Sequence, residues 1–99
     1  MSIPMLSTVA FAAVNAGGTF AVNRGFAGIV HNGAGDDTLE LVRGIDAPSL
    51  AVRLTVIGAP GLGMLSYVRV DDTHIQVLQS EAVPTNRSFL IEVLTVEAD

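Results

Sequence analysis

The segment Phe89-Leu90-Ile91-Glu92-Val93-Leu94-Thr95-Val96 decides how this 99-residue chain is interpreted. In an extended strand successive side chains point to opposite faces. Both faces of this strand are apolar, with Phe89, Ile91 and Val93 on one and Leu90, Leu94 and Val96 on the other. A strand with one face in water alternates apolar with polar residues. This strand therefore needs cover on both faces, and we expect a second copy of the protein to supply part of it.

The rest of the chain is divided into short extended runs by turn residues, which is typical of an all-β protein. Apolar residues at helical spacing do not persist anywhere. The predicted fold is an antiparallel β-sandwich or jelly-roll-like domain with about seven to eight short strands. Asn32-Gly33 predicts a hairpin turn, because both residues tolerate positive φ. The expected strands are residues 8–14, 19–23, 26–31, 38–43, 50–57, 65–70, 73–79 and 88–96.

The chain length predicts one domain without a linker. We expect residues 1–14 to form an N-terminal arm or a first strand, and residues 15–99 to form a single β-sandwich domain. The apolar segment 3–14 is a candidate arm for docking onto a neighbour by strand addition. If it is an arm, deletion of residues 1–12 leaves the domain folded.

Composition favours assembly over binding to nucleic acid or membrane. Apolar residues are 49% of the chain and charged residues only 15%, against about 25% charged in a typical soluble domain. The net charge is −5 and the five arginines are scattered, so there is no basic stripe for nucleic acid or an anionic membrane. The chain has no cysteine, which excludes disulfides and thiolate chemistry.

Motifs that carry chemistry are weak in this sequence. The Gly-rich segment 58–63 lacks the Gly-Lys-Ser/Thr ending of a phosphate loop, and there is no Gly-x-Ser-x-Gly elbow. His31 lies near Asp36-Asp37, and His74 near Asp71-Asp72, but paired-His metal spacing is missing. The two Asp pairs form a calcium site only if their loops meet in space. We therefore predict no enzyme activity, no catalytic residues, no cofactor and no metal.

Glu92 interrupts the second apolar face of the last strand. It occupies either a solvent-facing position or pairs with Arg53 or Arg69 across a subunit boundary, where such a pair sets register more than it adds stability. The predicted oligomer or docking interface comprises Met5, Leu6, Phe11, Leu90, Glu92, Leu94 and Val96.

Segment 26–41, FAGIVHNGAGDDTLEL, resembles a pattern of bacteriophage fibre and other virion β-domains, in which an extended run ends in a Gly-containing turn before the next strand. The later order is also similar. A Val-rich strand at 50–57 is followed by the Gly-rich loop, by VRVDDT at 68–73 and by the final strand at 89–96.

This resemblance implies a non-enzymatic virion structural protein, a homotrimeric β-sandwich that decorates the capsid as a cement or head-decoration protein. Its partners are then other copies of itself and a major capsid or tail protein, and it is located in the virion after synthesis in the host cytoplasm. The alternative is a tail-fibre or receptor-binding module that recognises a host surface ligand through the turns at 32–37, 58–63 and 80–87.

Overall fold

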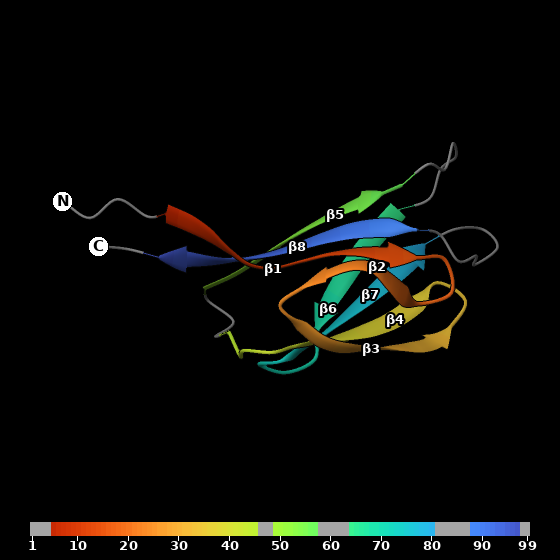
Figure 1. Ribbon diagram of the computed structural model, residues 1–99, viewed down its shortest axis with the longest axis horizontal. Helices are drawn as coiled ribbons and strands as arrows, with labels where there is room; N and C mark the ends of the chain where they lie inside the picture. The colour runs from red at the N-terminus through yellow and green to blue at the C-terminus, as the bar shows by residue number, and fades with distance from the viewer. Residues whose placement is uncertain (1–4, 46–48, 58–63, 81–87, 98–99) are drawn as a thin grey trace.

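The computed structural model describes residues 5–45, 49–57, 64–80 and 88–97. Within these ranges the secondary structure is all-β, and no helix is long and apolar enough to cross a membrane. The strands form two four-stranded antiparallel sheets, which confirms the predicted β-sandwich (Figure 1). Sheet A has the order β2-β1-β8-β5 and sheet B the order β3-β4-β7-β6. The strands are β1 (Met5–Asn15), β2 (Thr19–Arg24), β3 (Phe26–Gly33), β4 (Asp36–Leu41), β5 (Leu50–Val56), β6 (Met64–Arg69), β7 (His74–Ser80) and β8 (Phe89–Glu97).

The first and last strands lie side by side at the centre of sheet A. β1 pairs with β8 from Met5–Glu97 to Val14–Phe89 and with β2 on its other side. Of the two predicted roles for residues 1–14, an arm or a first strand, the structure shows the strand for residues 5–14; residues 1–4 lie outside the described ranges. Deleting residues 1–12 would remove much of a central strand, so that deletion does not isolate a docking arm.

The core lies between the inner faces of the two sheets. β8 contributes Phe89, Ile91 and Val93, all of which are fully buried. Ala10 and Ala12 of β1 pair with Val93 and Ile91, and these small side chains leave room for the larger ones beside them. The inner face predicted for β8 is therefore present. The remaining buried apolar residues are Val14, Phe26, Leu39, Leu41, Ile45, Ile75, Val77 and, on the outer face of sheet A, Leu94.

The chain crosses from sheet A to sheet B at Gly25, between β2 and β3. Gly25 has a φ of 90°, and a Cβ at this position would lie 2.5 Å from the Val9 carbonyl oxygen. Only glycine fits such a close approach at positive φ. Phe20 and Phe26 stack on either side of the crossing with ring centroids 5.9 Å apart. These contacts close the β2–β3 side of the sandwich.

The β3–β4 hairpin forms where it was expected, but its turn does not lie at Asn32-Gly33. β3 continues through Gly33, and the turn residues are Ala34 and Gly35, of which Gly35 has the positive φ, 70°. The Asn32 side chain donates to Thr38 Oγ1 at 2.8 Å and to Asp36 Oδ1 at 3.2 Å. Asn32 is the extra residue of a bulge between the His31–Asp37 and Gly33–Asp36 pairs, and these bonds hold its side chain across the hairpin, so the turn follows two residues later.

Candidate assembly surface

The outer face of sheet A, turned away from sheet B, is apolar along much of its two central strands and polar at Thr8, Arg24, Arg53 and Thr55. The register of β8 with its neighbours defines this face, because directly paired residues point to the same side of a sheet. Val22 of β2 and Val96 of β8 are 45% and 40% exposed there. We call the residues that point to this side of the sheet the sheet A outer face. Its apolar members are Phe11, Ala13, Val22, Ala51, Leu90, Leu94 and Val96.

The outer face of sheet B has a polar centre and apolar edges. Its central strands β4 and β7 present Thr38, Glu40, His74 and Gln76, and Gln76 Nε2 donates to an Asp36 oxygen at 2.8 Å. Val30 and Val68 lie on the edge strands and are 62% and 47% exposed. The two outer faces therefore differ along their centres, apolar in sheet A and polar in sheet B, and the sheet A outer face is the candidate for a partner.

Glu92 lies on the sheet A outer face directly opposite Arg53 of β5. The Arg53 Nη1 and Glu92 Oε1 atoms are 4.0 Å apart, and Arg53 is 64% exposed. A loose, exposed pair of this kind adds little to monomer stability. Arg69, the other predicted partner, lies on sheet B, where it pairs with Asp72 and donates to the Ile45 carbonyl. Pairing of Glu92 across a subunit boundary stays a prediction, with Arg53 as its candidate partner.

The predicted interface residues do not all have equal access to a partner. Leu94 lies on the outward side of β8 yet is only 5% exposed. Phe11 and Leu90 are half-buried. Met5 and Leu6 belong to β1 and pair with Glu97 and Val96 through the backbone, but the structure describes no side chain for either. The role of all these residues as an interface stays a prediction.

Three further residues complete the apolar part of the face and were not predicted as part of it. They are Ala13 of β1, Val22 of β2 and Ala51 of β5. The alternation of each strand shows two faces, but which face joins the outer surface depends on pairing between distant parts of the chain. Knowledge of the strand order was the missing signal.

The two predicted histidine clusters lie at opposite ends of sheet B. His31 Nδ1 is 2.6 Å from Asp37 Oδ1, with the carboxylate nearly buried and Gly18 packed over the pair. His74 lies beside the β6–β7 turn, where Nδ1 is 2.8 Å from Asp71 Oδ1. The pairs Asp36-Asp37 and Asp71-Asp72 do not meet, because β4 separates them. The described residues contain no group of three or more side chains suited to holding a metal.

The His74 cluster has shifted protonation equilibria. The hydrogen bond that His74 Nδ1 donates to the Asp71 carboxylate raises the pKa of His74 above its usual 6.5, and Glu40, whose Oε2 lies 3.3 Å from His74 Nε2, also favours the charged ring. The same His74 bond and the Thr73 backbone N–H lower the pKa of Asp71 to about 2. This cluster ties the turn to β4. Of the turns predicted to recognise a host ligand, residues 58–63 and 81–87 lie outside the described residues.

The chain was compared with protein-family models, with curated proteins and with solved structures, and no match was found in any of the three.

Proposed function

We propose that this protein is a non-enzymatic structural protein that self-associates through the sheet A outer face. Following its sequence resemblance, we propose that it decorates a bacteriophage capsid as a trimer. The observation that carries the proposal is the apolar run along the centre of the sheet A outer face, where Phe11, Ala13, Leu90 and Leu94 lie on the paired strands β1 and β8. A contiguous apolar patch on a soluble domain marks an interaction site.

The charge distribution favours a second copy as the occupant. Among the acidic side chains that the structure describes, five lie on sheet B or its β6–β7 turn, namely Asp36, Asp37, Glu40, Asp71 and Asp72. The sheet A outer face carries Glu92 together with Arg24 and Arg53. This face therefore lacks the negative excess of the whole chain, which is −5. Two acidic copies repel each other least when these faces meet.

The size of the face is also adequate. A sheet of four strands is about 19 Å wide at the usual strand spacing, and the nine residues of β8 extend about 30 Å. The flat area is thus about 570 Å², the same order as the roughly 800 Å² that each partner buries in a stable interface. In a trimer each copy turns this one face toward the threefold axis.

The first test is the native mass of the protein by light scattering across a dilution series. We expect a stable mass of three copies of the 10.3 kDa chain. Val22→Asp should lower the mass toward the monomer, because a carboxylate enters the apolar interface. Val68→Asp is the matched control, since Val68 is similarly exposed, 47% against 45%, but lies on sheet B. Equal behaviour of the two variants would contradict the assignment of the face.

The capsid step is tested separately. The trimer is mixed with undecorated phage capsids, and bound protein is measured after sedimentation. We expect saturable binding of the wild-type protein and of Val68→Asp, with loss for Val22→Asp. Absence of binding by a trimeric wild-type protein would remove capsid decoration and leave the self-associating structural protein.

A further inference from the structure

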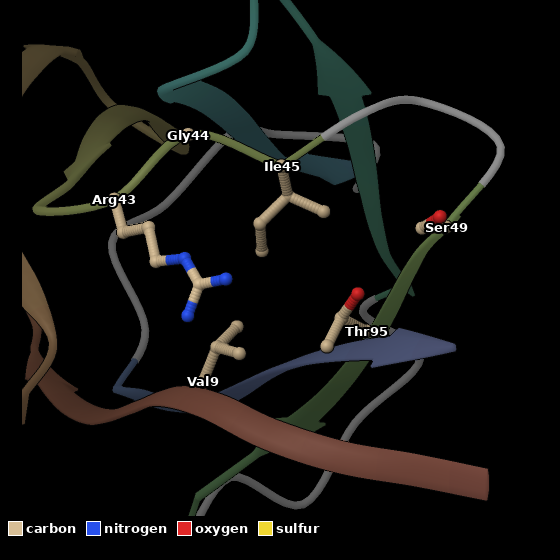
Figure 2. A pocket seen from close by; sticks show the side chains of 6 residues that line it. All are labelled: Val9, Arg43, Gly44, Ile45, Ser49 and Thr95. Carbon is tan, nitrogen blue, oxygen red and sulfur yellow. The ribbon is translucent and has the colours of Figure 1, made fainter. Parts of the chain in front are cut away.

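A small hollow lies at the end of the sandwich where β4 finishes and β5 begins (Figure 2). It has a volume of about 190 Å³. Its walls come from four separate parts of the chain, and neither the sheet A outer face nor the histidine clusters contribute to them. The lining residues are Val9, Arg43, Gly44, Ile45, Ser49 and Thr95.

The wall that carries Arg43 is held in place although it is not part of a strand. The Val42 N–H donates to the Gly25 carbonyl at 3.0 Å, and the Ile45 N–H donates to the Asp72 carbonyl at 2.9 Å. The Ile45 carbonyl in turn accepts a bond from Arg69 at 3.1 Å. The backbone of segment 42–45, which carries the exposed Arg43 side chain, is therefore fixed to three other segments.

Arg43 points its guanidinium into this hollow, between the apolar side chains of Val9 and Ile45 (Figure 2). The hydroxyl-bearing side chains of Ser49 and Thr95 form the wall on the other side. No carboxylate of the described residues lies within 4.0 Å of Arg43, whereas Arg53 and Arg69 both have acidic partners. A guanidinium among hydroxyls and apolar walls is a site for a planar anion.

We propose that the Arg43 hollow binds one carboxylate group. The guanidinium donates two parallel N–H bonds to the carboxylate oxygens, and the two hydroxyls are placed to donate from the far wall. Val9 and Ile45 contact the short apolar stem that carries the carboxylate. Arg43 supplies a single positive charge in a chain whose net charge is −5. It therefore favours a singly charged anion over the more highly charged phosphate. The carboxylate comes either from a free small acid or from an acidic residue of a neighbouring molecule.

The test is a two-dimensional NMR titration of the full chain with sodium acetate, at constant ionic strength and with sodium phosphate in parallel. We expect saturating shifts at Gly44, Ile45 and Thr95 with acetate and weaker ones with phosphate. Arg43→Gln should weaken acetate binding by about tenfold to a hundredfold, as expected for losing a charge-assisted bond. Arg24→Gln removes the same charge at the edge of the sheet A outer face, away from the hollow, and should bind acetate as the wild type does when both are titrated in the Val22→Asp background.

Three results would overturn the proposal: no saturating shifts, shifts that persist in Arg43→Gln, or phosphate binding more tightly than acetate. Light scattering then separates the two sources of the carboxylate. A neighbour's carboxylate is indicated if acetate and Arg43→Gln both lower the native mass, and a free acid if neither does. The site does not depend on self-association, because a failure of Val22→Asp to change the mass leaves the acetate result intact.

Discussion

Replacing Ile91 by alanine should destabilise the fold much more than replacing Leu90, its neighbour in β8. Ile91 is fully buried on the inner face, opposite Ala12 and Leu54. Loss of its three outer carbon groups removes about 2.4 kcal/mol of transfer free energy at ~0.8 kcal/mol each. β8 itself is paired on both sides, so its backbone cannot move to close the gap, and a cavity of roughly 60 Å³ adds about 1.4 kcal/mol. The free energy of unfolding should therefore fall by about 4 kcal/mol.

Leu90 loses the same number of carbon groups but lies half-buried on the outer face and leaves no closed cavity. Half of that transfer free energy predicts that the free energy of unfolding of the monomer falls by about 1 kcal/mol in Leu90→Ala. For a domain of this size each kcal/mol shifts Tm by about 4–8 °C. We therefore expect Tm to fall by about 16–32 °C in Ile91→Ala and by about 4–8 °C in Leu90→Ala.

The assay is urea unfolding of each substitution in the Val22→Asp background, which we expect to be monomeric, followed by the native mass of each single variant. Leu90→Ala should assemble less well than the wild type while keeping most of its monomer stability. The reasoning is refuted if Leu90→Ala loses as much unfolding free energy as Ile91→Ala in that monomeric background. In that case both faces of β8 are covered within one chain, and the proposed assembly surface does not exist.

Three further results are expected from single substitutions. Gly25→Ala should lose more than about 2 kcal/mol of unfolding free energy in urea, because alanine is strained at a φ of 90° and its Cβ would meet a backbone oxygen of β1. The NMR titration midpoint of His74 should lie above 6.5 and fall on Asp71→Asn, and its stabilising effect should be present below pH 6.5 and disappear as pH rises through the folded-state midpoint. Val52→Asp, on an edge strand and partly buried, should lower Tm less than Val93→Asp, which places an unpaired charge in the closed core.

Most of the fold could be predicted from local patterns. Alternation along β5 and β8 placed their side chains on the correct faces, because a period of two is a property of the strand itself. Turn residues located the connections within a few positions. The Asn32-Gly33 turn was two residues early because the Asn32 side chain bonds across the hairpin instead of bending the chain. That contact depends on Thr38, whose position relative to Asn32 is known only after the strands pair.

The candidate sites depend on contacts between distant segments and were predicted less well. Val22 joins the sheet A outer face only because β2 pairs with β1, and β1 lies beside the last strand of the chain. Arg43 gave no signal in the sequence, because the hollow of the proposed carboxylate site is formed with Thr95, which is far from Arg43 in the chain. Side chains that are far apart in sequence meet through strand order, and strand order has no local signature.

The difference between the outer faces also predicts where assembly stops. A protein whose sheet A outer face is covered by copies related by a rotation axis forms a closed oligomer, because closed symmetry leaves no equivalent face free to extend it. The opposite face carries Asp36, Glu40 and Asp71, so oligomers that approach through sheet B meet like charge. Self-association should therefore end at a defined number of copies with an acidic exterior. A capsid surface that receives such an oligomer must present neutral or basic side chains, and raising the salt concentration should weaken that attachment before it weakens the apolar contacts within the oligomer.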